Sequence, residues 1–309
     1  GFFIVIGVSA TLAALVTLTV IGKMAHPGPT KLPNAMLLTY TFTPDLLETI
    51  THPSLHQPLL RSPTTFHEVV DKLTSAAKDS RVKGFAAKIE DIDMTPAQIQ
   101  ELRGVVAKFR AAGKSASVFS SDFGAMSSGM GGYYLASGFD KVWLQPVGGL
   151  SATGVAAEVP FVKGALDKIG VEPSFLHKGI YKSAPESLTA SGMSILNREM
   201  MTDLVEDLAD QMINDIAVDR KMTPEALKQV VNAAPYSDSD ALKLGLVDKL
   251  GYYNQMLKDA KLKANDLDID TVDLMSYLPT QKAGRAPQSK IALIIGSGDI
   301  HSTSGAHAG

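Results

Sequence analysis

The chain has 309 residues, of which 45% are apolar and 20% are charged, so it can bury a sizeable core and wholesale disorder is excluded. The formal net charge is −3, which leaves no basic excess to neutralise phosphates and disfavours nucleic acid as a partner. Cysteine is absent, which excludes disulfides, thiolate catalysis and metal sites with cysteine ligands.

The chain opens on an uncharged apolar run, from Gly1 to Gly22. As a helix this run would be about 33 Å long, which is enough for the apolar core of a bilayer. It is longer than the apolar region of a cleaved signal peptide, which is the alternative. We therefore expect a transmembrane anchor, followed by a proline-rich linker over residues 23–35. We also expect the chain to be a fragment, because it starts with Gly and stops shortly after a second apolar run.

From residue 36 onward, short apolar strands alternate with amphipathic helices. The pattern predicts strands over residues 36–42, 84–89, 117–119 and 142–144, and helices over residues 66–77, 95–109, 194–220 and 224–231. Thr95 and Pro96 supply a helix cap and a first-turn proline. Strand–helix units of this kind predict an α/β fold with a mainly parallel sheet.

The longest predicted helix carries apolar residues at helical spacing, which we expect to form a buried stripe. They are Met201, Leu204, Val205, Leu208, Met212 and Ile216. Residues 34–42 and 290–298 share an apolar strand followed by a turn, which indicates an internal repeat. The predicted organisation is an anchor (1–22), a linker (23–35), an α/β repeat (36–285) and the start of a truncated second repeat (286–309).

No cofactor or metal site is expected. The seven histidines have no metal-ligand spacing. The sequence has no P-loop, no dinucleotide fingerprint and no nucleophile elbow of the G-x-S-x-G type.

Two segments could carry chemistry. Residues 127–136 form a small-residue turn that leads into an apolar helix, where backbone N–H groups could stabilise an oxyanion, or where glycines could serve packing alone. Residues 177–185 place Lys182 after a strand-like stretch over residues 173–176. A lysine drawn into an apolar cleft loses its proton more readily and can act as a base. The alternative is an ordinary surface lysine.

At these segments the sequence resembles the bacterial signal peptide peptidase SppA family (protease IV) in its long, internally duplicated form. The resemblance is carried by G-G-Y-Y-L-A-S (131–137), D-K-V-W-L-Q-P (140–146), Y-K-S-A (181–184) with Glu186 after it, and G-L-V-D (245–248). It covers the anchor, the linker and the N-terminal of the two repeats.

The resemblance implies a ClpP/crotonase-like fold and a serine peptidase that works with a Ser/Lys dyad. It assigns the general base to Lys182. In short family members the nucleophile precedes G-G-Y-Y, where this chain has Met130. In the long form the nucleophile comes from the second repeat, so we expect this chain to supply only the lysine. Ser128 and Ser183 are poorly placed to replace it.

The resemblance further implies that the protein degrades cleaved signal peptides at the bacterial inner membrane. The catalytic domain would face the periplasm, residues 1–22 would contact lipid, and the protein would be a homo-oligomer, expected to be a tetramer. Two other readings stay open: a catalytically inactive membrane scaffold, and an acyl-CoA enzyme of crotonase type. The anchor and Lys182 disfavour the second.

Overall fold

The computed structural model describes residues 32–44, 46–48, 64–124, 128–264 and 266–279. The predicted anchor over Gly1–Gly22, most of the linker and the predicted second repeat over 286–309 lie outside these ranges. Within the described ranges, no helix combines the length and the apolar composition that a bilayer crossing needs.

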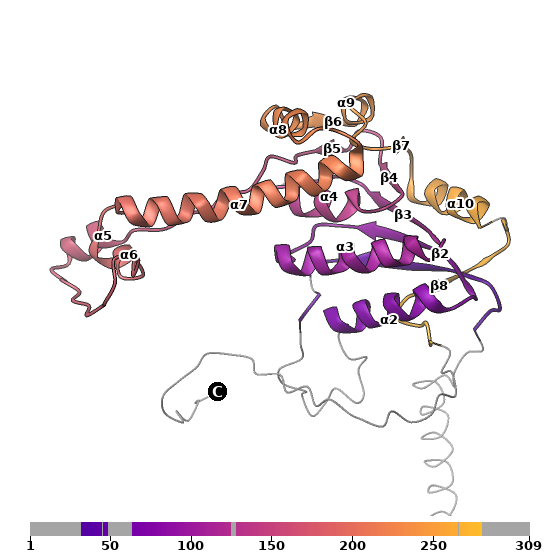
Figure 1. Cartoon of the computed structure of the whole chain (residues 1–309), viewed down its shortest axis with the longest axis horizontal. Coiled ribbons are helices and arrows are strands. Elements are labelled where there is room, and N and C mark those ends of the chain that lie inside the picture. The colour runs from indigo at the N-terminus through magenta and orange to yellow at the C-terminus, as the bar shows by residue number, and fades with distance from the viewer. Residues whose placement is uncertain (1–31, 45, 49–63, 125–127, 265, 280–309) are drawn as a thin grey trace, which may run out of the picture.

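Six parallel strands form the central sheet, in the order β7-β4-β3-β2-β1-β8 (Figure 1). They are β1 (Met36–Phe42), β2 (Val82–Ile89), β3 (Ser115–Ser120), β4 (Lys141–Leu144), β7 (Lys249–Leu250) and β8 (Asp270–Asp273). β5 (Gly149–Leu150) and β6 (Tyr236–Ser237) form a separate antiparallel pair. The predicted parallel-sheet α/β fold is confirmed, and the four predicted strands are β1 to β4.

The helices of the described residues are α2 (Phe66–Lys78), α3 (Pro96–Ala111), α4 (Met130–Ser137), α5 (Lys163–Lys168), α6 (Glu186–Thr189), α7 (Ile195–Arg220), α8 (Pro224–Asn232), α9 (Asp238–Lys243) and α10 (Tyr253–Lys263). Helices cover both faces of the sheet, whereas α5 and α6 lie away from it (Figure 1). α2, α3 and α4 lie side by side on one face, and α10 packs against β2 and β3 on the other (Figure 1). The expected cap is present: Thr95 and Gln98 form a capping box at the start of α3.

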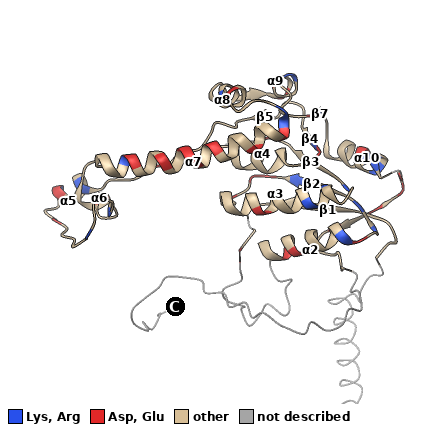
Figure 2. Ribbon diagram, in the orientation of Figure 1, with Lys and Arg blue, Asp and Glu red and all other residues tan. Residues whose placement is uncertain are grey.

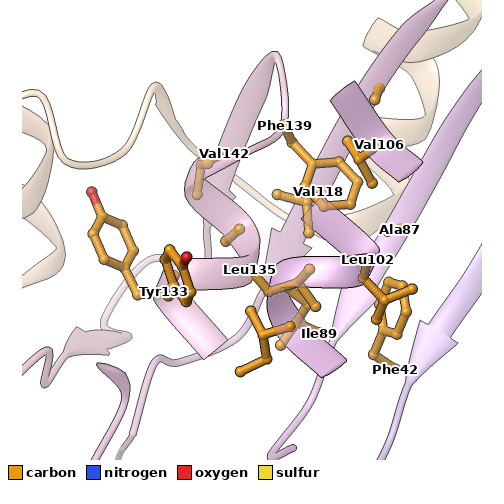
Figure 3. Close-up of a cluster of buried hydrophobic side chains, with 14 of the residues drawn as sticks. Phe42, Ala87, Ile89, Leu102, Val106, Val118, Tyr133, Leu135, Phe139 and Val142 are labelled. Carbon is orange, nitrogen blue, oxygen red and sulfur yellow. The ribbon is translucent and has the colours of Figure 1, made fainter. Parts of the chain in front are cut away.

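The strand side chains alternate between two cores. Val118 and Val142 belong to the larger cluster, part of which is shown in Figure 3, whereas Phe119 and Trp143 belong to a smaller cluster under α10. Successive side chains of a strand point to opposite faces, so a strand covered on both sides must be apolar at nearly every position. This explains the continuous apolar runs in the sequence.

Residues 153–207, which we call the arm, project away from the sheet (Figure 1). The arm contains α5, α6 and the N-terminal half of α7, and acidic side chains are spaced along that half of the helix (Figure 2). Two predictions fail here. Residues 173–176 form no strand, and the predicted buried stripe of α7 is buried only from Met212 onward, while Leu204 is 60% exposed. Leu208 packs at the edge of the larger core, and the residues before it are at most half-buried because the helix extends beyond the sheet that would cover it.

Candidate active site

A cavity of about 370 Å³ opens at the carboxyl ends of β2 and β3. It is lined by Glu90, Asp91 and Ile92 after β2, by Ser121, Asp122, Phe123 and Gly124 after β3, and by Ser128, Gly129, Gly131 and Gly132 at the start of α4. Ligands of open parallel sheets bind in a crevice at this end of the strands. The cavity is therefore where the fold would place an active site.

The turn before α4 requires glycine. The N–H of Gly129 donates to the carbonyl of Ser151 at 2.9 Å, and the N–H of Ser151 donates to the carbonyl of Phe123 at 2.8 Å. A Cβ atom on Gly129 would lie 2.1 Å from that Phe123 oxygen. The close packing fixes the turn and sets the N-terminus of α4 against the cavity, which Gly131 and Gly132 line; the first N–H groups of a helix have no partner within the helix itself.

Met130 is the first residue of α4 and occupies the position where the resemblance expects a nucleophile. Its side chain is 2% exposed and belongs to the larger core. Met130 lines a small apolar void of about 10 Å³ together with Tyr133, Leu150 and Leu227, and it is absent from the lining of the cavity. The thioether therefore fills the core behind the turn.

The two serines weighed as substitutes are far from a dyad arrangement. Ser128 lines the cavity, and its hydroxyl donates to the carbonyl of Gly154 at 3.3 Å. Ser183 lies on the arm, next to Lys182. Within the described residues, no lysine lines the cavity beside Ser128.

Lys182 is exposed and lies in the segment between α5 and α6, two helices at the distal end of the arm (Figure 1). Its apolar neighbours in the chain are exposed as well: Ile180 by 74% and Tyr181 by 54%. Lys182 does not line the cavity beside the turn, and α5 and α6, which flank it in the chain, are separated from α4 by the projecting half of α7 (Figure 1).

Glu186 ties the Lys182 loop to α7. Its carboxylate accepts hydrogen bonds from the Ser194 hydroxyl at 2.6 Å, the Ser194 N–H at 3.1 Å and the Asn197 amide at 2.8 Å. The bonds from Ser194, and then that from Asn197, hold the pKa of Glu186 below its usual range. Glu186 is thus an anion that fastens α6 to the first turn of α7.

The other segments that carry the resemblance are joined to one another. The Tyr133 hydroxyl donates to the carbonyl of Leu246 at 2.7 Å, and burial raises the pKa of this phenol. The Asp248 carboxylate accepts from the N–H of Val142 at 2.7 Å and from Arg220 at 3.0 Å. These hydrogen bonds therefore join three of the segments that carry the resemblance to one another: G-G-Y-Y, K-V-W-L and G-L-V-D.

The acidic residues at the cavity were not singled out from the sequence. Glu90, Asp91 and Asp122 follow directly after the ends of β2 and β3. Asp122 accepts a hydrogen bond from the N–H of Gly149 at 2.7 Å, and Glu90 pairs with Lys88 at 2.7 Å. Their place just after strand ends was the available signal. No cluster of metal-ligating side chains occurs among the residues that the structure describes.

Comparison with known proteins identifies the family. The model of peptidase family S49 matches residues 108–267, just over half of the chain. The chain belongs to peptidase family S49. This membership agrees with the resemblance to SppA proteins.

Two curated relatives are the chloroplastic serine protease SPPA of Arabidopsis thaliana and Protease 4 of Haemophilus influenzae. The first is 24% identical and the alignment covers 77% of this chain; the second is 25% identical and the alignment covers 78%. The chain spans only 35% and 40% of the length of these relatives. Among solved structures, a mutant of ClpP1 from Listeria monocytogenes matches at 10% identity with a TM-score of 0.38, covering 79% of this chain and 99% of that one. A score at this level adds nothing to the fold that the sheet itself defines.

Proposed function

We propose that this chain is the lysine-bearing repeat of a membrane-anchored serine peptidase that degrades cleaved signal peptides with a Ser/Lys dyad. Lys182 is the general base, and the nucleophilic serine belongs to a second repeat that the chain only begins. Membership of family S49 and the names of the relatives support the peptidase activity.

The observation that carries the proposal is the separation of two half-sites. The turn at the cavity has a buried thioether at Met130, where a nucleophile would stand. The candidate base, Lys182, lies between α5 and α6 on the arm (Figure 1) and is absent from the lining of the cavity at the turn. A chain that supplies a base to another domain has both features.

The chemistry follows from the dyad. The neutral amine of Lys182 takes the proton from the serine hydroxyl as the oxygen attacks the scissile carbonyl, and it returns that proton to the leaving amine. Water then cleaves the acyl-enzyme ester. Contact with the second repeat has to cover Lys182, because burial disfavours the charged form of a lysine.

The test is Lys182→Arg in the complete protein that contains this chain. Guanidinium stays protonated at any working pH, so it cannot act as a base. We expect hydrolysis of a signal-peptide substrate to fall by at least about 100-fold, which is within the range for loss of a general base. Lys178→Arg, on the same loop and also exposed, is the matched control and keeps its activity. Near-native turnover of Lys182→Arg would remove Lys182 from the dyad.

We further propose that Gly1–Gly22 anchors the chain in the bacterial inner membrane, with the α/β repeat on the periplasmic side. The uncharged run and its length support this. Alkaline carbonate extraction of membranes measures it: an anchored protein stays in the pellet, and release into the supernatant contradicts the proposal.

Assembly into a homo-oligomer, expected to be a tetramer, is proposed as well. The arm exposes large apolar side chains, including Leu176 at 104% and Ile195 at 86%. Exposed apolar patches commonly mark contact surfaces. Analytical ultracentrifugation of the complete protein decides this, since a monomer at micromolar concentration would contradict it.

A second candidate function, a peptidase-like scaffold without activity, is favoured by one observation. Met130 has no nucleophilic hydroxyl and is packed in the core. The downstream reading frame distinguishes the two: a Ser-Gly-Gly-Tyr turn about 250 residues after Met130, a spacing set by the internal repeat, supports the peptidase, and its absence supports the scaffold.

A further inference from the structure

The arm is long compared with the part of α7 that packs against the rest of the fold. α7 has 26 residues, which corresponds to about 39 Å. Leu208 is the first apolar residue of α7 that packs against the larger core, so the half that precedes Leu208 projects by about 20 Å. A rotation of α7 by about 10° at its packed end would move the distal end by about 3.5 Å, which exceeds the usual hydrogen-bond distance between a general base and its nucleophile.

The distal end of the arm is hydrogen-bonded to α7 itself. Glu186, four residues after Lys182, accepts hydrogen bonds from Ser194 and Asn197 at the start of α7. The position of Lys182 relative to the sheet therefore depends on the angle between α7 and the rest of the fold.

Apolar packing alone defines this angle poorly. Ile213, Ile216 and Ala217 bury the base of α7 against the body, but apolar contact is non-directional. A helix held only by such contacts can rock on its neighbour. Directional contacts have to set the angle.

A polar cluster at the base supplies those contacts. Arg103 of α3 donates to Asp219 of α7 at 2.8 Å, to the Ser137 hydroxyl at 2.8 Å and to the Tyr134 carbonyl at 2.5 Å. The Tyr134 hydroxyl donates to Asp215 at 2.5 Å, and the Arg103 guanidinium lies 4.3 Å from the centre of the Tyr134 ring. We call these five residues the clamp.

The clamp joins three helices through groups that are mostly buried. The Arg103 and Asp219 side chains are 12% and 17% exposed, so their ion pair is screened less than a surface pair. Asp215 and Asp219 are one helical turn apart and present their carboxylates to the same side. Burial, followed by the hydrogen bond to Asp215, raises the pKa of Tyr134 to about 12, so this phenol remains a donor at neutral pH.

We propose that the clamp of Arg103, Tyr134, Ser137, Asp215 and Asp219 is a positioning device that sets the angle of the arm and thereby places Lys182. The catalytic consequence rests on the proposed function, whereas the effect on the arm does not. Arg103 touches neither the cavity nor Lys182, so it acts through α7.

Arg110 provides a matched comparison within the same helix. It lies two turns after Arg103 on α3, donates to Asp140 at 2.6 Å and donates to the carbonyl of Gly138 at 2.8 Å. It thus joins α3 to the end of α4, as Arg103 does, but none of its hydrogen bonds reaches α7. A general loss of ion pairing on α3 would affect both arginines.

The experiment measures the arm directly. The chain has no cysteine, so spin labels can be placed cleanly at Leu176→Cys on the arm and Lys108→Cys on α3. Both positions are exposed, and dilution with unlabelled protein removes distances between copies. Pulsed electron–electron double resonance of the 309-residue chain then gives the distribution of distances between the label on the arm and the label on α3.

We expect Asp219→Asn and Arg103→Lys to broaden this distribution or shift its mean by several ångströms, while Arg110→Lys leaves it unchanged. Circular dichroism confirms that each variant is folded. If Arg103→Lys does not fold, Asp219→Asn decides, because it preserves the shape of the side chain. An unchanged distribution in the folded Asp219→Asn variant overturns the clamp.

Kinetics of the complete peptidase supply the second measurement. Displacing a reacting group by about 1 Å can reduce the rate about 100-fold, so we expect Asp219→Asn to lower kcat by about that factor and to change KM little. Arg110→Lys should keep both constants. If Lys182→Arg stays active, the proposed function fails while the spin-label distances still decide the clamp. If only the distances are unchanged, the clamp fails alone.

Discussion

A substitution of Met130 tests whether the side chain at the start of α4 faces the cavity or the core. Restoring a hydroxyl by Met130→Ser would create a nucleophile if this side chain faced the cavity. The structure instead places the side chain, 2% exposed, against Tyr133, Leu150 and Leu227. We therefore expect Met130→Ser to damage the core without creating a reactive serine.

The expected magnitude has two parts. Truncating a buried methionine and leaving a cavity costs about 2–5 kcal/mol, and burying a hydroxyl without a partner costs a further 1–3 kcal/mol, roughly. Met130→Leu keeps the volume and the apolar character, so it should cost less than about 1.5 kcal/mol. The difference between the two variants isolates the buried environment of residue 130 from any general sensitivity of the turn.

Urea unfolding followed by circular dichroism measures the free energies of unfolding, and a fluorophosphonate probe measures serine reactivity. We expect Met130→Ser to be several kcal/mol less stable than Met130→Leu, with neither variant labelled. Stoichiometric labelling of Met130→Ser at the stability of Met130→Leu would show that the side chain faces the cavity, and it would refute the reasoning.

Two further predictions concern packing and charge. Gly129→Ala should lower the melting temperature by at least about 5 °C, because its Cβ would meet the Phe123 carbonyl oxygen at 2.1 Å. Gly104→Ala is the control and should be neutral or stabilising, because the space around Gly104 is open. Equal melting temperatures of the two variants would contradict this prediction. Burial acts to raise the pKa of Asp259, but hydrogen bonds from Lys249 and Lys141 outweigh it and hold the pKa below the usual 3.8. A carboxyl group whose pKa is depressed in the folded state stabilises the fold at pH values above its usual pKa, and this stabilisation disappears as the pH falls through the folded-state pKa. Asp259→Asn should therefore lower the free energy of unfolding by about 1 kcal/mol at about pH 7 and by less at about pH 3. A difference in urea unfolding that does not change with pH would argue against this prediction.

The sequence by itself determined the sheet and most of its covering helices. The strands β1 to β4 were predicted within two residues because strands buried on both faces must be apolar at nearly every position. Thr95 and Ser194 fixed the starts of α3 and α7 through cap bonds to residues three positions ahead. Such signals lie within one or two turns of chain, so they survive without knowledge of the rest of the fold. The motifs that carry the resemblance also identified the family.

Only the tertiary structure decided what these elements meet. The apolar stripe of α7 reads the same along its length, yet Met212 is buried and Leu204 is exposed, because burial depends on whether another segment reaches that side of the helix. The sequence showed that Met130 lacks a hydroxyl, but not that its side chain turns into the core. It singled out Lys182, but it did not place this lysine on a projecting arm. Arg103 carried no sequence signal, since its partners lie 31 to 116 residues away and meet only when α3, α4 and α7 pack together.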